Sequence, residues 1–165
     1  MSSVDEEFMR VALDLAEQAA SQDEVPVGAV IVADGRVVGR GFNQRESQRN
    51  PLLHAEISAI DMAAKELGQW RLSECAIYVT LEPCIMCVGA ILQARLNRLV
   101  FGCLDAKAGA VESLYRLCED RRLNHQLPAV GGVLGDQAGE LLSRFFSRLR
   151  ARKRESKIGE RWPSG

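Results

Sequence analysis

The sequence predicts an α/β fold, a three-layer α-β-α sandwich in which helices cover both faces of one five-stranded mixed sheet. Two observations carry this prediction. Short apolar runs typical of strands alternate with longer stretches whose apolar residues recur at helical spacing, and this alternation is typical of a sheet covered on both faces. The first two strands are joined by Asp34-Gly35, a tight-turn signal, and an opening hairpin makes the sheet mixed.

The first half of the chain predicts a helix, a hairpin and a second helix. Apolar residues recur at helical spacing from about residue 4 to residue 20. Strands are expected at residues 26–32 and 36–42. After a polar loop, the second helix is expected over residues 54–67, with Gly68 as its stop signal.

The second half predicts three further strands, each followed or preceded by a helix. Pro83 suits the first position of a helix, because its missing N–H costs nothing there. The expected elements are a strand at 76–80, a helix at 83–94, a strand at 98–101, a short helix at about 112–118, a strand at 129–134 and a final helix from about Gln137.

Composition indicates one soluble globular domain. Hydrophobic residues make up 47% of the chain and charged residues 26%, which suffices for a sizeable core. No apolar run approaches the ~18 residues that a membrane span needs, and the acidic N-terminus lacks the basic start of a secretory signal. We therefore expect a cytoplasmic protein without a membrane partner. The five cysteines are an odd number, which argues against a disulfide framework and leaves thiols free for metal binding.

Basic residues concentrate at the C-terminal end. The whole chain has a net charge of −1, but residues 144–161 contain eight bases and two acids, a net charge of +6. Such a segment is either a solvated helix end that frays or a tail that contacts phosphates. We expect one folded domain over residues 1–155 and a basic, frayed tail over residues 156–165.

Two short segments, His54-Ala55-Glu56 and Pro83-Cys84-Ile85-Met86-Cys87, carry residues suited to metal chemistry. Each lies at an expected helix N-terminus, where a positive helix dipole lowers thiol pKa values. Cys84 and Cys87 are three residues apart and share a helix face. With His54 they give Zn²⁺ three protein ligands, and a fourth position left open for water is typical of a catalytic zinc.

Glu56 is expected to move protons rather than to bind the metal. Two residues of helix separate it from His54, a divergence of roughly 200°. A carboxylate beside the metal can take a proton from water and pass it to a ring nitrogen and then to a leaving amine.

Other interpretations of the cysteine pair remain open. A Cys-x-x-Cys pair can be a redox couple, although Pro83 precedes this pair rather than lying inside it. It can also be half of a four-ligand structural zinc site, completed by Cys75 or Cys103. The His-x-Glu segment followed by Pro-Cys-x-x-Cys favours the catalytic zinc.

In that combination and order, these residues match the signature of the cytidine-deaminase-like zinc deaminases. Over nearly its whole length the chain further resembles the bacterial tRNA-specific adenosine deaminases. The segments that carry this resemblance are Glu24–Val30, Thr80–Ala90, Val100-Phe101-Gly102, Asp105-x-Lys107-x-Gly109-Ala110, Leu123-Asn124-His125 and Leu142-x-x-Phe145-Phe146.

The resemblance implies hydrolytic conversion of adenosine to inosine at the wobble position of a tRNA anticodon. It implies one Zn²⁺ per subunit, held by His54, Cys84 and Cys87, with Glu56 as the proton shuttle, and no organic cofactor. It also implies a homodimer that binds the anticodon loop. The implied substrate contacts are Asn43 to the flipped base, Asp105 to a ribose 2′-OH, Lys107 to phosphate, and Asn124 and His125 to the anticodon loop.

Two other functions use much of the same sequence. A deaminase of a free nucleobase or nucleoside, such as guanine, cytosine or cytidine, needs the same ligands and the same Glu56. A non-catalytic zinc domain that binds RNA needs the ligands but not Glu56. The chain departs from the pattern of the tRNA deaminases at Asn50, Leu104, Glu112 and Arg121-Arg122, which affects the expected RNA contacts and leaves the zinc ligands unchanged.

Overall fold

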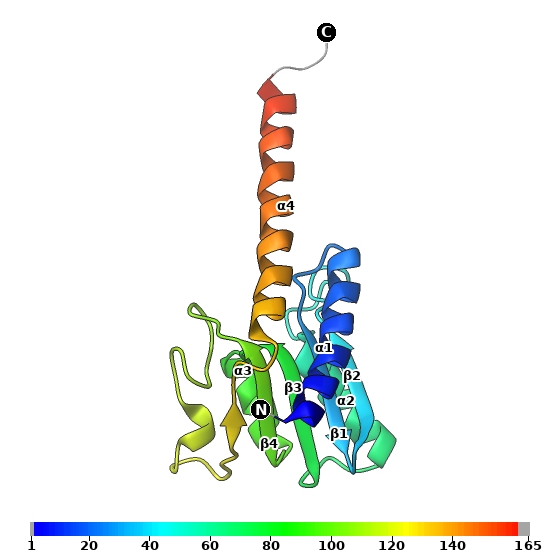
Figure 1. Ribbon diagram of the computed structural model, residues 1–165, viewed down its shortest axis with the longest axis vertical. Coiled ribbons are helices and arrows are strands. Elements are labelled where there is room, and N and C mark those ends of the chain that lie inside the picture. Colours follow the sequence, from blue (N-terminus) through cyan, green and yellow to red (C-terminus); the bar gives the residue numbers. More distant parts are fainter. Residues whose placement is uncertain (1, 162–165) are drawn as a thin grey trace.

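Five strands form one sheet in the order β2-β1-β3-β4-β5 in the computed structural model, which describes residues 2–161 (Figure 1). β1 runs antiparallel to β2 and β3, whereas β3, β4 and β5 run parallel. The predicted five-stranded mixed sheet is therefore confirmed. The strands are β1 (Gly28–Ala33), β2 (Arg36–Phe42), β3 (Cys75–Leu81), β4 (Arg98–Cys103) and β5 (Ala129–Val130).

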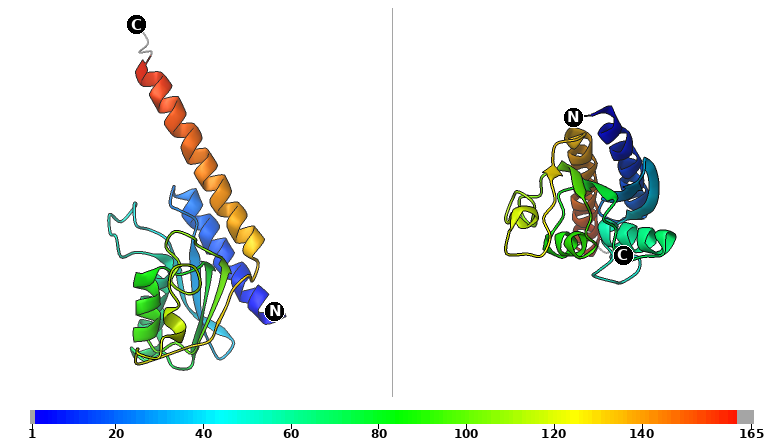
Figure 2. Two further views of the ribbon diagram at one scale, coloured as in Figure 1. Left: turned by 90° about the vertical axis from the view of Figure 1, so that its left-hand side faces the viewer. Right: turned by 90° about the horizontal axis from the view of Figure 1, so that it is seen from below.

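Helices cover both faces of this sheet, as predicted. α1 (Ser3–Ser21) and α4 (Gly135–Arg161) lie on one face, and α2 (Ala55–Leu67) and α3 (Ile85–Gln93) lie on the other (Figure 2). A single 3₁₀ turn, η1 (Leu117–Glu119), interrupts the connection between β4 and β5. Among residues 2–161, no helix is long and apolar enough to cross a membrane.

Alternate residues of each strand point to opposite faces, so the sheet supports two cores. Ile31 and Ile77 pack with α2 and α3 in the larger core. Val30, Tyr78 and Val100 pack with α1 in the smaller one. The period-two pattern of the strands therefore sets which helices each strand residue meets.

α2 approaches the sheet closely because small residues face each other across the contact. Ala55 and Ala59 of α2 are fully buried, and a Cβ at Gly39 or Gly41 of β2 would overlap the backbone carbonyls of α2. This close packing fixes the start of α2, and hence the residues that follow His54, against the sheet.

The start of α3 differs from the prediction. Pro83 does not occupy the first helical position, because the helix begins at Ile85 with Cys84 as its N-cap. The Pro83 carbonyl accepts a hydrogen bond from Ala110 N, and Cys84 forms an isolated bridge with Gly109. These contacts hold residues 83–84 extended, so the helix starts two residues later than expected.

Two further elements differ from the prediction. The helix expected at 112–118 shortens to η1, because backbone N–H groups of residues 111–113 bond to a carboxylate rather than continuing a helix. The strand expected at 129–134 ends at Val130, where Gly131 and Gly132 (φ 88°) turn the chain away from the sheet.

The final helix begins at Gly135 and continues through Arg161. Residues 156–161 of the expected tail thus belong to α4, and residues 162–165 lie outside the described part of the chain.

Candidate active site

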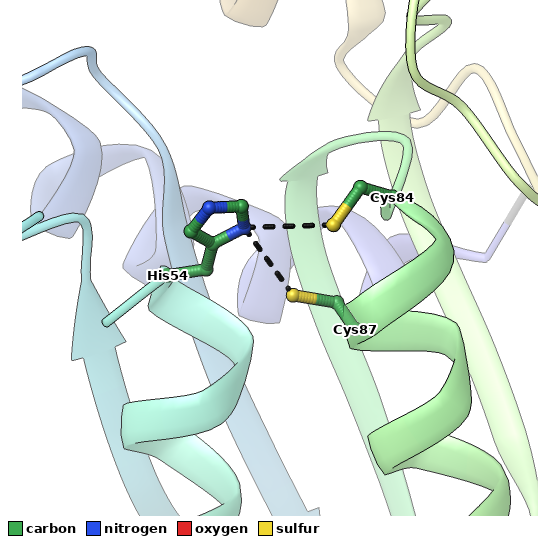
Figure 3. Close-up of side chains that lie close together, drawn as sticks. All are labelled: His54, Cys84 and Cys87. Atoms are coloured by element: carbon green, nitrogen blue, oxygen red, sulfur yellow. Dashed lines mark hydrogen bonds between the residues drawn. The ribbon is translucent and has the colours of Figure 1, made fainter. Parts of the chain in front are cut away.

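Three side chains from two helix N-termini converge at one edge of the sheet (Figure 3). His54 is the N-cap of α2 and Cys84 the N-cap of α3, both with extended backbone. Cys87 lies in the first turn of α3 and is fully buried. The ligand atoms of the three residues lie within 4.8 Å of one another. The structure thus brings together the three metal ligands expected from the sequence.

The spacing of these atoms fits a tetrahedral zinc. His54 Nδ1 lies 3.6 Å from Cys84 Sγ and 3.5 Å from Cys87 Sγ. With Zn–N bonds of about 2.0 Å and Zn–S bonds of about 2.3 Å, tetrahedral geometry places nitrogen and sulfur about 3.5 Å apart. One imidazole and two thiols are also ligands that zinc prefers. The residues present therefore fit this metal.

Hydrogen bonds within the cluster favour a thiolate at Cys84. The Cys87 thiol and then the His54 imidazole stabilise that thiolate and lower the pKa of Cys84 to about 4. The same pairing raises the pKa of His54 and the pKa of Cys87. These contacts therefore favour the deprotonated form of Cys84, and a metal ion displaces ligand protons when it binds.

Glu56 faces the same centre although it follows His54 by only two residues. His54 is a cap with φ −75° and ψ 157° rather than a helical residue, so the divergence of an ideal helix does not apply. Glu56 Oε2 lies 3.4 Å from Cys87 Sγ. The carboxyl group is 4% exposed, and this burial raises its pKa. It is therefore placed to hold or release a proton beside the three ligands.

A cavity of about 200 Å³ opens onto the cluster. Its polar lining includes Asn43, Arg45, Glu56 and Asp105, and its apolar lining includes Val27. A cavity of this size is smaller than the usual pocket for a drug-sized ligand, so it suits a single base rather than a large molecule.

Two hydrogen bonds with backbone groups hold the Asn43 side chain at the cavity wall. Its amide Nδ2 donates to the Val25 carbonyl over 3.3 Å, and its Oδ1 accepts from Arg45 N over 3.3 Å. Both bonds are long, and the residue is 8% exposed. The amide therefore retains capacity to donate to and accept from a base.

A buried carboxylate holds the loop on one side of the cavity. Glu82 is 1% exposed, and its oxygens accept bonds from four backbone N–H groups and one hydroxyl. The donors are Asp105 N, Val111 N, Glu112 N, Ser113 N and Ser113 Oγ. Burial alone would raise the pKa of Glu82, but these bonds, led by those from Ser113, lower it overall. The group is therefore a carboxylate that orders residues 105–113.

A second buried carboxylate holds the loop on the other side. Glu24, 1% exposed, accepts bonds from Glu46 N (2.9 Å), Ser47 N (3.3 Å) and Ser47 Oγ (3.2 Å). Neither Glu24 nor Glu82 was predicted from the sequence to have a role. The available signal was an acid directly beside an apolar strand segment.

Asp105 and Lys107 occupy a tight turn. Asp105 Oδ1 accepts from Lys107 N (3.1 Å) and Ala108 N (3.2 Å), so one carboxylate oxygen organises the turn. Asp105 lines the cavity, whereas the exposed Lys107 lies beyond its lining.

Asn124 and His125 lie apart from the cavity. They line a separate hollow beside α3 with Gly89 and Arg95. His125 Nε2 lies 2.7 Å from the Leu96 carbonyl, which ties its loop to the segment between α3 and β4. Asn124 and His125 can therefore contact only those parts of a substrate that lie outside the cavity.

A His-Cys-Cys centre at two helix N-termini, on the edge of a mixed sheet covered by helices, defines the class of zinc-dependent deaminases. The family model for the cytidine and deoxycytidylate deaminase zinc-binding region matches residues 2–103. The chain belongs to this family and, within it, to the tRNA-specific adenosine deaminases, and it binds one Zn²⁺.

Three similar proteins illustrate this relationship. A tRNA-specific adenosine deaminase of Bacillus subtilis is 43% identical over 93% of this chain and 95% of its own length. A solved structure from studies of A-to-I editing by tRNA:A34 deaminases is 44% identical, with a TM-score of 0.80, and covers 82% of this chain and 99% of that chain. The guanine deaminase of Bacillus subtilis is 37% identical, with a TM-score of 0.58, over 63% of this chain and 66% of that one.

Proposed function

We propose that this protein converts adenosine to inosine by hydrolytic deamination at the wobble position of a tRNA anticodon. One observation carries the proposal. The buried Glu56 lies beside the His54, Cys84 and Cys87 cluster, at the wall of a cavity sized for one base. The similarity to tRNA-specific adenosine deaminases supports tRNA as the source of that base.

The three ligands hold Zn²⁺ through His54 Nδ1 and the sulfurs of Cys84 and Cys87. When bound, the metal supplies Lewis acidity that makes a water molecule nucleophilic near neutral pH. The remaining chemistry belongs to the protein.

Glu56 transfers the protons. It accepts a proton from the water that attacks C6 of adenine and delivers one to N1. Glu56 then takes the proton of the new C6 hydroxyl and gives it to the amino nitrogen as the bond between C6 and that nitrogen breaks, so ammonia leaves and C6 becomes a carbonyl. Its burial suits both roles, because a raised pKa brings a carboxyl group closer to the operating pH.

The cavity and its rim bind the nucleotide. Asn43 hydrogen-bonds the flipped base from the cavity wall, and Asp105 reaches the ribose from the adjacent turn. Lys107, Asn124 and His125 contact the flanking nucleotides of the anticodon loop from outside the cavity. The cavity is too small for a base pair. The base therefore enters it from a nucleotide that is flipped out of its stack.

We further infer that the protein acts as a homodimer in the cytoplasm, with residues 1–155 forming the deaminase domain. The basis is the resemblance to homodimeric tRNA deaminases. No organic cofactor is required by this chemistry.

The test uses zinc-loaded protein and a tRNA with adenosine at the wobble position, with inosine read by sequencing. Conversion at that single position is expected, and the same tRNA with guanosine there should remain unchanged. Glu56→Gln should lose turnover by several orders of magnitude while retaining zinc and RNA binding. Turnover by Glu56→Gln at the wild-type rate would refute the assigned role.

Zinc content tests the ligand assignment separately. Cys87→Ala should lose stoichiometric zinc, because two remaining ligands bind the metal far more weakly than three. Cys118→Ala is the matched control, since this buried cysteine lies outside the cluster. Equal zinc in both variants would contradict the assignment.

Free adenosine, guanine and cytidine serve as competing substrates in the same assay. Ammonia release from one of them, with an untouched tRNA, would assign the site to a free base or nucleoside. Stoichiometric zinc without any deamination would instead indicate a non-catalytic zinc domain.

A further inference from the structure

The C-terminal part of α4 projects beyond the body of the protein (Figure 1). The buried residues of this helix are Ala138, Leu141 and Phe145, all in its first half. Among the described residues, the last ion pair from this helix to the body is an exposed one, 2.8 Å between Arg152 Nη1 and Asp23 Oδ1. Every residue from 153 to 161 is exposed. Nine residues of helix extend about 13 Å.

This tip has no apolar face of its own to bury. Within the part of the chain that the structure describes, no residue packs against residues 153–161, and the segment is polar apart from an exposed Ile158. Helices gain most of their stability from packing one face against a neighbour. A helix of this kind is therefore suited to gain order from a partner.

Basic side chains along the C-terminal part of α4 form a row. Bases recur at positions i, i+3, i+4, i+7 and i+11, which places them within an arc of about 100° on one face of the helix. Of the two acids, Glu155 lies well outside this arc and Glu160 lies about 20° beyond its margin. The residues of this row, hereafter the α4 basic row, are Arg150, Lys153, Arg154, Lys157 and Arg161.

The tip projects beyond the same end of the sheet at which the residues lining the cavity lie. α4 starts beside Gly102, near the carboxyl ends of the parallel strands, where Glu82 and Asp105 also lie. From there it leans over that edge toward the face covered by α2 and α3, as both views of Figure 2 show. A polynucleotide with one base in the cavity therefore has its neighbouring segments within reach of the tip.

We propose that the α4 basic row binds backbone phosphates of the anticodon stem of the tRNA whose loop enters the cavity. This inference rests on the proposed function. The stem adjoins the loop and carries closely spaced phosphates. Arginine and lysine on a projecting helix contact such phosphates without reading sequence. The row thereby adds affinity and orientation, while the cavity selects the base.

The experiment compares the full-length wild-type chain with the triple variant Lys153→Gln, Arg154→Gln and Lys157→Gln. Glutamine keeps the helix propensity and removes the charge. The matched control removes three exposed bases at the opposite end of the domain, as Arg36→Gln, Lys65→Gln and Arg71→Gln. Equilibrium binding to tRNA is measured by fluorescence anisotropy over a range of salt concentrations, so the readout does not depend on turnover.

The triple variant should bind tRNA about tenfold more weakly near physiological salt. The slope of log affinity against log salt should fall by about 2 to 3, since each phosphate contact contributes about 0.7 to 0.9. The control should match wild type. A hairpin shortened to the loop and its closing base pair should bind wild type and triple variant equally.

Unchanged affinity and salt slope in the triple variant would overturn the proposal. So would loss of a dimer, measured by sedimentation, in place of loss of RNA affinity, because the row would then contact a second copy. If wild type binds tRNA through the row but deaminates none, the proposed function fails while this surface stands.

Discussion

Replacement of Glu82 tests whether a buried carboxylate orders the loop at the cavity rim. Glu82 Oε2 accepts from the N–H groups of Val111, Glu112 and Ser113, and Oε1 accepts from Asp105 N and Ser113 Oγ. In Glu82→Ala all five donors lose their acceptor. In Glu82→Gln one oxygen remains for the three N–H groups, and the new NH₂ can donate to Ser113 Oγ, so chiefly the Asp105 bond is lost.

The expected costs follow from this difference. A buried donor left without an acceptor costs about 1–3 kcal/mol. The Val111 bond is buried, whereas the other donors lie at partly exposed positions where water can replace the carboxylate. We expect Glu82→Ala to lower the unfolding free energy by about 2–4 kcal/mol and Glu82→Gln by about 1–2 kcal/mol. For a domain of this length, each 1 kcal/mol lowers Tm by about 2–4 °C.

Urea unfolding and steady-state kinetics on zinc-loaded protein measure both effects. Because residues 105–113 border the cavity, KM for tRNA should rise more than kcat falls, with Glu82→Gln between wild type and Glu82→Ala. Glu112→Gln is the control, since it removes an exposed carboxylate from the same loop. A Glu82→Ala protein with wild-type stability and wild-type KM would refute the role of Glu82 in ordering the loop.

Two further predictions concern other buried contacts. Asp5 pairs with Arg98 and accepts a hydrogen bond from Tyr78, and these contacts lower its pKa from 3.8 to about 2. Above pH 4 the wild-type protein should therefore have a larger free energy of unfolding in urea than Asp5→Asn. This difference should shrink by about 2 kcal/mol as the pH falls from 4 through 2, because Asp5 becomes protonated. A gap independent of pH would contradict this. A Cβ at Gly109 would overlap the Glu82 carboxylate, whereas a Cβ at Gly139 would meet open space. Gly109→Ala should therefore lower the free energy of unfolding by about 1–3 kcal/mol. Equal stability of Gly109→Ala and Gly139→Ala would exclude the overlap.

Elements with strong local signals were predictable from the sequence. The hairpin at Asp34-Gly35 and the helix stop at Gly68 depend on turn residues adjacent to the element, and both are present, with Gly35 at φ 72° and Gly68 at φ 66°. The three metal ligands were also predictable, because their spacing places them at helix starts. Their mutual distances depend on the sheet, which sets the separation of α2 and α3.

Boundaries governed by tertiary contacts were predicted less well. Local propensity favours Pro83 at a helix start and a helix over 112–118, yet both segments bond to distant parts of the chain instead. The Pro83 carbonyl accepts from Ala110, 27 residues further along the chain, and Glu82 takes the N–H groups that a helix would need. Where a side-chain acceptor from another strand competes for backbone donors, propensity within the segment has little weight.

The same competition explains why Glu24 and Glu82 were not predicted. Both carboxylates bind mainly backbone N–H groups, which every residue except proline supplies, so the partner positions carry no sequence pattern. Glu112 departs from the pattern of the tRNA deaminases, but the group that Glu82 uses there is its backbone N–H, and its side chain is exposed. A substitution at such a position changes the outer surface of the rim while the loop keeps its path. The departures at Leu104 and Glu112 therefore change exposed side chains outside the cavity lining, and they leave the cavity wall in place.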